Sequence, residues 1–96
     1  MSFINAFQKK YKCGYVFFHQ LFPNALELLQ KSLPVLDKAI SRGDGNEWRQ
    51  TIKAIKSISE DMCFKKLKNL KVNTNKPNCK DYYIITIEIN KLANFQ

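Results

Sequence analysis

The chain has few of the residues on which catalytic motifs depend. It contains one histidine, His19, and three glycines too scattered for a phosphate-binding loop or a dinucleotide fingerprint. Its cysteines, Cys13, Cys63 and Cys79, include no Cys-x-x-Cys pair, so neither a zinc site nor a disulfide framework is indicated. We therefore expect reduced thiols, no metal and no cofactor, and a histidine that packs structurally rather than one that catalyses.

Long apolar runs are also missing. The longest apolar patch, residues 15–18, is far too short to span a bilayer. Lysines at positions 9, 10 and 12 interrupt the N-terminal region before the apolar core of a signal peptide forms. These features predict a soluble, cytoplasmic protein with no membrane contact.

Acidic residues are scarce compared with basic ones. Sixteen Lys+Arg face eight Asp+Glu, which gives a net charge of +8 and a pI near 9.5. Such an excess favours an anionic partner such as nucleic acid, an acidic protein or a membrane surface. Only Arg42 and Arg49 are arginines, and lysine suits phosphate backbones rather than base edges, so we expect any nucleic-acid contact to be sequence-independent. The alternative is that the lysines serve solubility alone.

The length of 96 residues, with 45% hydrophobic and 25% charged residues, predicts a single globular domain over 1–96. Phe3, Phe7 and Tyr11 recur at helical spacing and predict a short first helix. Asn24 followed by Glu27 predicts the start of the next helix.

Apolar residues at spacings of three and four, ending at position 40, continue that second helix. Pro34 should kink it or divide it in two. Gly43 predicts a left-handed cap, with Asn46 capping a further helix whose apolar face starts at Trp48 and ends at Met62. The two long helical regions should form an antiparallel hairpin.

The C-terminal third is predicted to form strands. Leu70 and Val72 alternate with polar residues, and residues 81–89, Asp-Tyr-Tyr-Ile-Ile-Thr-Ile-Glu-Ile, place Tyr83, Ile85, Ile87 and Ile89 on one face of a strand. The fold class predicted is therefore α+β, with N-terminal helices that include a helical hairpin packed on a small C-terminal antiparallel sheet.

Basic residues are densest between positions 49 and 80, and Phe64 within this range or Tyr82 or Tyr83 just after it could stack a base beside a phosphate backbone. We take the nucleic-acid-binding residues to be Arg49, Lys53, Lys56, Lys65, Lys66, Lys68, Lys71 and Lys80.

Three segments between positions 53 and 89 carry a resemblance to a known family: Lys-Ala-Ile-Lys at 53–56, Phe-Lys-Lys-Leu-Lys-Asn-Leu at 64–70, and the run at 81–89. In this order they resemble the second half of the RelE/ParE-type toxins of bacterial toxin–antitoxin systems. The resemblance implies a helical hairpin against a small antiparallel sheet. It also implies a ribosome- or mRNA-directed endoribonuclease, or a gyrase poison, with RNA or the ribosome and a cognate antitoxin protein as partners.

Tyr83 stands where the strand of that family usually has arginine, the residue expected to stabilise phosphate charge in the transition state. Cleavage would then rest on a lysine, for which we take Lys66, and on Tyr82 or Tyr83 as general acid or base. The alternative function is a non-catalytic small binding protein, such as a phage-encoded inhibitor that docks on an acidic or nucleic-acid-binding partner.

Overall fold

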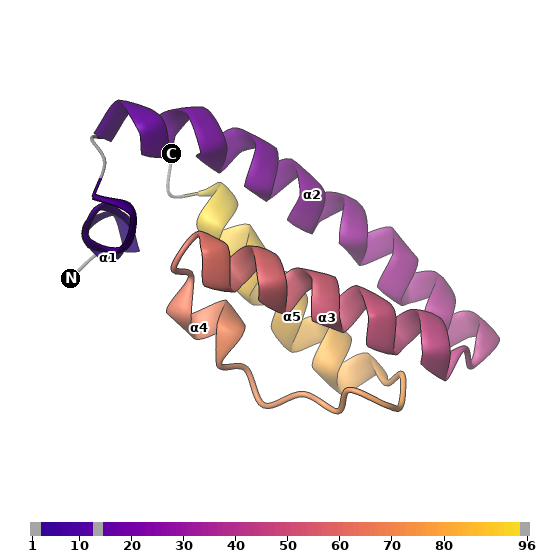
Figure 1. Ribbon diagram of the computed structural model, residues 1–96. Coiled ribbons are helices and arrows are strands. Elements are labelled where there is room, and N and C mark those ends of the chain that lie inside the picture. The colour runs from indigo at the N-terminus through magenta and orange to yellow at the C-terminus, as the bar shows by residue number, and fades with distance from the viewer. Residues whose placement is uncertain (1–2, 13–14, 95–96) are drawn as a thin grey trace.

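A computed structural model describes residues 3–12 and 15–94, and every regular element in these ranges is a helix (Figure 1). The helices are α1 (Phe3–Tyr11), α2 (Tyr15–Arg42), α3 (Gly45–Asp61), α4 (Lys65–Lys68) and α5 (Cys79–Ala93). They form an elongated body with principal extents of 43 × 19 × 19 Å. Cys13 lies outside the described residues, while Cys63 is half-buried and Cys79 is exposed, both as free thiols.

The first helix forms as predicted and is anchored by one aromatic residue. Phe7 is fully buried, and its ring meets the ring of Phe18 in α2 edge to face at 5.2 Å between centroids. Tyr11, on the same helix, is 40% exposed. A helix of this length needs tertiary packing to persist, and the Phe7–Phe18 contact supplies it.

Helix α2 runs without a break through both of its prolines. Its start at Tyr15 and its single span show that the predicted helix start at Asn24 and the division into two helices are wrong. Pro23 and Pro34 are both exposed. Each proline removes one amide donor, and on the solvent side water can satisfy the carbonyl that this leaves, which makes the interruption tolerable.

The predicted hairpin of α2 and α3 is confirmed (Figure 1). Gly43 adopts φ 62°, and the amides of Gly43 and Asp44 donate to the carbonyls of Ile40 and Ala39, which closes a Schellman motif. The cap of α3 is Asp44 rather than Asn46, because the Asp44 side chain accepts from the amide of Glu47 at 3.0 Å. The predicted inner face of α3 is buried at Trp48, Ile52, Ile55 and Met62.

The predicted C-terminal strand is helix α5, so the α+β fold class with its antiparallel sheet is wrong. Ile85, Ile89 and Leu92, at spacings of four and three, form the buried face of α5. Asn78 caps the helix by accepting from the amide of Asp81 at 2.9 Å. The alternation over 81–89 fits a strand only because apolar residues fall on nearly every position, and burial against α2 overrides the β propensity of isoleucine.

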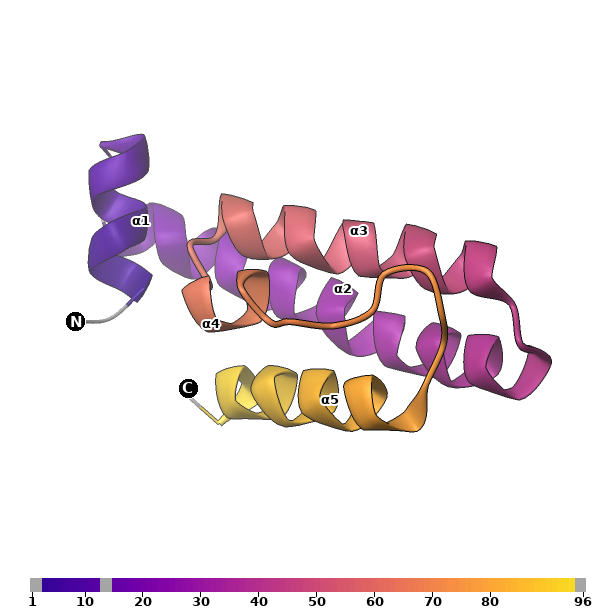
Figure 2. The ribbon, with the colours of Figure 1, turned by 90° about the horizontal axis from the view of Figure 1, so that it is seen from below.

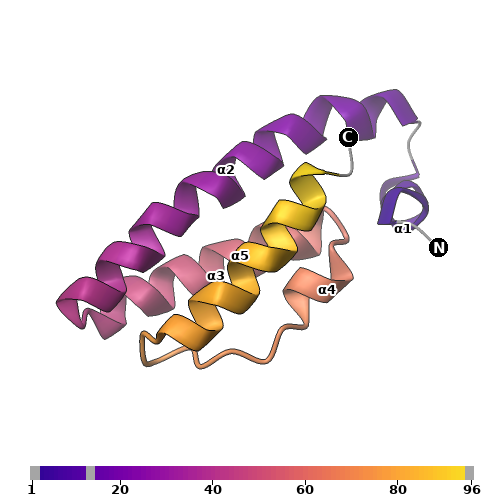
Figure 3. The ribbon, with the colours of Figure 1, turned by 180° about the vertical axis from the view of Figure 1, so that it is seen from behind.

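Helix α5 runs back along the hairpin, and the chain between α4 and α5 crosses the open side of the bundle (Figures 2 and 3). This irregular segment, residues 69–78, contains the second predicted strand around Leu70 and Val72, which is also wrong. Both side chains are half-buried against the hydrophobic core. Within the described part of the chain, no helix is both long and apolar enough to cross a membrane.

Candidate anion-binding surface

Segment 69–78, which we call the strap, is held along α3 at three places. The Lys56 amine donates to the carbonyls of Lys68 and Leu70 at 3.0 and 3.2 Å. The indole of Trp48 donates to the Asn73 carbonyl at 2.7 Å. Near the start of α3, a Cβ added to Gly45 would lie 2.9 Å from the Asn75 carbonyl oxygen, so glycine is required for this close approach. The strap therefore follows α3 from its last turns back to its first.

The same strap is fixed to α5 by a buried carboxylate. Asp81 is 8% exposed, and its Oδ2 accepts from the Asn73 amide and from the Asn78 side-chain amide, both at 2.8 Å. Asn73 thus bonds to α3 through its carbonyl and to α5 through its amide. This double attachment sets where the basic residues of the strap lie relative to both helices.

Two of the predicted nucleic-acid-binding residues on α3 have structural partners. Lys56 is half-buried and its amine holds the end of α4, where carbonyls lack helical donors. The Arg49 guanidinium donates to the Asn46 side chain at 3.0 Å. Lys53, one turn from both, is exposed and has no hydrogen bond or ion pair to the described residues.

A third predicted residue, Lys68, forms an ion pair with Glu60 at 3.1 Å. The hydrogen bond from Lys68, with the charges of Lys68 and Lys10, lowers the pKa of the Glu60 carboxyl from its ordinary value. Lys10 also reaches this junction, because its amine donates to the Glu60 backbone carbonyl at 3.1 Å. Through its backbone carbonyl and its carboxylate, Glu60 links α1 and α4 to α3 at one end of the molecule.

The remaining lysines of this region are uncompensated. Of the acidic groups nearby, Asp44 and Asp81 bond to backbone amides and Glu60 pairs with Lys68, while the carboxylates of Glu47 and Asp61 form no ion pair with a described residue. Six lysine side chains here are exposed and make neither an ion pair nor a hydrogen bond within residues 3–12 and 15–94. They are distributed over α3, α4, the strap and the first turn of α5, and we call them the basic surface: Lys53, Lys65, Lys66, Lys71, Lys76 and Lys80.

The predicted catalytic residues are not brought together by any hydrogen bond among the described residues. Lys66 is exposed on α4, whereas Tyr82 and Tyr83 lie on α5. Tyr82 is half-buried and packs against the core, while Tyr83 is 66% exposed. Neighbouring residues of a helix point about 100° apart, so the two phenols face different surroundings. Phe64, the other proposed stacking residue, is 3% exposed and belongs to the core.

No protein-family model, curated protein or solved structure matches this chain. What the basic surface can do is therefore argued from its own geometry. Exposed ammonium groups can neutralise phosphate or carboxylate charge. In the described ranges, no three His, Cys, Asp or Glu side chains lie together in a way that could hold a metal ion.

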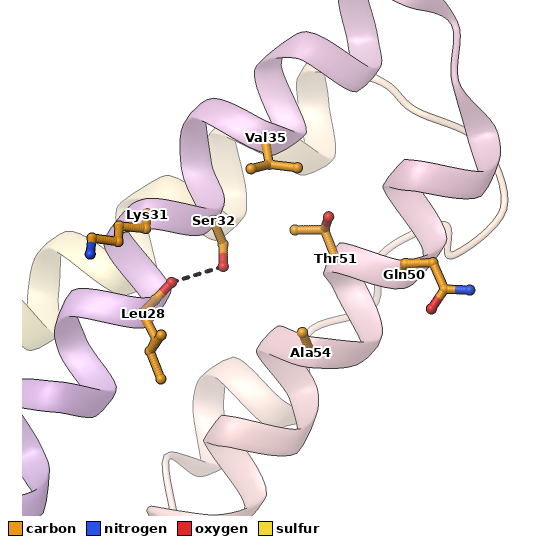
Figure 4. A pocket seen from close by; sticks show the side chains of 7 residues that line it. All are labelled: Leu28, Lys31, Ser32, Val35, Gln50, Thr51 and Ala54. Atoms are coloured by element: carbon orange, nitrogen blue, oxygen red, sulfur yellow. Dashed lines mark hydrogen bonds between the residues drawn. The ribbon is translucent and has the colours of Figure 1, made fainter.

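A second feature is an open groove of about 320 Å3 between α2 and α3 (Figure 4). Leu28 and Val35 line it from α2, and Thr51 and Ala54 line it from α3. Leu28 is 54% exposed, and the Ser32 hydroxyl in the wall donates to its backbone carbonyl at 2.9 Å. Leu28 and Val35 lie outside the apolar face predicted for this helix, and a groove formed between two helices has no signal in the spacing of residues along one of them.

The outer face of α5 exists only because this segment is a helix, so a predicted strand could not indicate it. As a helix, this segment places Lys80, Tyr83, Ile87 and Lys91 on one face, at spacings of three, four and four. The signal that reveals the helix is the capping pair Asn78 and Asp81, three residues apart.

Proposed function

We propose that the protein binds the phosphate backbone of RNA and that the basic surface is the contact region. The observation that carries the proposal is the set of six exposed lysines that lack partners, gathered on segments tied together by the strap. A folded protein gains nothing from leaving like charges unneutralised on adjoining segments unless solubility or a polyanion uses them.

The kind of residue indicates how RNA is held. Lysine amines are flexible point charges that neutralise phosphates, and none of the six positions is an arginine suited to paired contacts with a guanine edge. Binding should therefore depend strongly on salt and only weakly on sequence. The ribosome, as an RNA-rich particle, is one partner that such a surface fits.

The test is the salt dependence of RNA binding, measured by fluorescence anisotropy with a labelled single-stranded oligoribonucleotide. The variant Lys65→Ala/Lys66→Ala removes two exposed amines of α4 without removing any contact inside the protein. Each lost phosphate contact lowers the slope of log K against log salt by about 0.7 for a single strand, so the double variant should lower it by about 1.4.

The matched control is Lys9→Ala/Lys38→Ala, which removes the same charge from exposed residues of α1 and α2 that lie outside the basic surface and form no ion pair or side-chain hydrogen bond within the described residues. Its slope should stay at the wild-type value. A slope lowered equally in both variants would show that net charge alone attracts RNA, and a wild-type slope in Lys65→Ala/Lys66→Ala would show that these two amines do not contact phosphate. Failure of the wild-type protein to bind RNA at low salt would refute the proposed function.

RNA cleavage by a toxin-like protein is a separate hypothesis, drawn from the sequence resemblance. It assigns catalytic roles to Lys66, Tyr82 and Tyr83 and a neutralising role to an antitoxin. Expression in bacteria should then arrest growth, and Lys66→Ala should relieve the arrest while leaving the fold unchanged. Normal growth together with intact cellular RNA would refute cleavage without affecting the binding proposal.

The second candidate function is a non-catalytic protein that binds another protein, and the groove between α2 and α3 supports it. An exposed leucine beside small residues is a surface into which an apolar side chain of a partner can pack. A partner retained after nuclease treatment, lost with Leu28→Lys and kept with Lys65→Ala/Lys66→Ala, would favour this function over RNA binding.

A further inference from the structure

The outer face of α5 combines an exposed aromatic ring with lysines. Tyr83 is 66% exposed, more than any other large hydrophobic residue in the described chain. Lys80 lies one turn before it, and Ile87 and Lys91 follow at successive turns. Residues three or four apart on a helix have Cβ atoms about 5–6 Å apart, so these four side chains adjoin one another.

The core does not explain why a tyrosine occupies this position. The buried face of α5 consists of Ile85, Ile89 and Leu92, on the opposite side of the helix. Among the described residues the Tyr83 ring has no stacking partner and its hydroxyl has no hydrogen bond. Its neighbour Tyr82, in contrast, packs against the core. The Tyr83 ring is therefore available to a ligand from outside.

We propose that Tyr83 is a stacking platform for an unpaired base of single-stranded RNA, with Lys80 neutralising an adjacent phosphate. The inference rests on the proposed RNA binding and adds the form of RNA that is recognised. An aromatic face accepts any base, since every base has a π-face, which agrees with contacts that do not read sequence. Bases within a duplex are stacked on each other and cannot reach such a ring.

Charge complementarity favours RNA over the other occupants of such a face. The chain carries +8, and Lys80 on this face has no acidic partner within the described ranges, while Lys91 pairs with Glu88 at 3.2 Å. A helix that lies on a membrane presents a broad apolar face, often with tryptophan, phenylalanine and leucine. Here the exposed aromatic is a single tyrosine between lysines. Unpaired bases are also abundant in the loops and ends of RNA.

The experiment compares single-stranded RNA with an RNA duplex at one salt concentration. Tyr83→Leu keeps an apolar side chain but removes the ring, and we expect affinity for a uridine-rich single strand to fall about 10-fold, with affinity for the duplex unchanged. Tyr83→Phe keeps the ring and should bind the single strand as wild type does. Tyr82→Phe is the matched control on the adjoining residue. In Tyr83→Trp, the new indole emission should be quenched by the single strand.

The outcomes separate this inference from the proposed function. Wild-type affinity of Tyr83→Leu for the single strand, beside an intact salt slope, would overturn stacking and leave phosphate binding standing. Equal losses for single strand and duplex would also overturn stacking. Two results would overturn RNA as the ligand of this face. One is tighter binding of the wild-type protein to single-stranded DNA than to RNA. The other is a Tyr83→Leu variant that loses binding to anionic vesicles but keeps its affinity for RNA. No RNA binding by wild type would refute both proposals.

Discussion

Replacing Asp81 should detach the strap from α5, and the size of the effect follows from two hydrogen bonds. Asp81 Oδ2 accepts from the Asn73 amide and the Asn78 side chain, both at 2.8 Å, in a site where the residue is 8% exposed. Hydrogen bonds to a charged group contribute about 1.5–3 kcal/mol each. A carboxylate in the first turn of a helix adds about 0.3–1 kcal/mol.

In the variant, water can hydrogen-bond to the donors that Asp81 leaves unpaired, because Asn73 itself lies at the surface. We therefore expect Asp81→Ala to lower the free energy of unfolding by about 2–4 kcal/mol, well below the sum of the separate contributions. For a chain of this size the melting temperature should fall by about 10 °C or more. Asp81→Asn keeps an acceptor oxygen without the charge and should cost about 1 kcal/mol.

Urea denaturation measures the free energy of unfolding, and hydrogen exchange measures the protection of the Asn73 amide itself. The amide of Asn73 should lose its protection in Asp81→Ala, since Asp81 is its acceptor. The control Asp37→Ala removes an exposed carboxylate of α2 and should change stability by less than about 0.5 kcal/mol. If Asp81→Ala matched that control in stability and kept the Asn73 amide protected, the attachment of the strap would be refuted.

Three further perturbations address the contacts around the basic surface. Trp48→Phe removes the indole donor to the Asn73 carbonyl and leaves space in the core, because Trp48 is fully buried, so the free energy of unfolding should fall by at least about 1–3 kcal/mol in urea denaturation, and an unchanged value would contradict both contacts. Cys63 has φ 61° at the end of α3, so Cys63→Gly should be more stable than Cys63→Ala by about 1 kcal/mol, and the reverse order would contradict the left-handed cap. Lys68→Met should raise the pKa of Glu60 toward its ordinary value in an NMR titration. Because the Glu60 pKa is lowered in the folded state, the ionised carboxylate stabilises the fold above its unfolded-state pKa. This contribution is lost as pH falls through the folded-state pKa. The free energies of unfolding of Lys68→Met and wild type should therefore converge in acid.

The N-terminal two-thirds of the fold follow from local sequence signals. Apolar residues at spacings of three and four predict the hairpin, and Gly43 marks its turn, because a left-handed residue after a helix is most easily a glycine. The wrong division at Pro34 has a physical reason, since an exposed proline interrupts a helix less than a buried one does, and the wrong helix start at Asn24 arose because Asn24 and Glu27 have the spacing of a capping box although both lie inside α2.

The C-terminal third could not be assigned from alternation alone. Between Tyr82 and Ile89, apolar residues occupy almost every position, so a period of two and a period of 3.6 fit equally well. What decides between them is the cap at Asn78 and the buried face of Ile85 and Ile89 against α2. A strand also needs a neighbour, and the strap is occupied by contacts to side chains of α3 and α5.

The basic residues, which a sequence count treats alike, have different roles in the fold. Lys56 is half-buried and holds backbone carbonyls, so it can contribute little to a ligand without weakening the fold, whereas Lys68 pairs with Glu60 at the surface, where an ion pair adds little stability. The side chains of Lys65, Lys66 and Lys71 make no hydrogen bond or ion pair within the described residues. The hydrogen bonds of Asn73 fix the strap that carries Lys71, so the proposed RNA binding would cost the entropy of the lysine side chains but not that of ordering a loop. Detaching the strap would add that cost, and the strap contacts would then influence RNA affinity although none of them touches RNA.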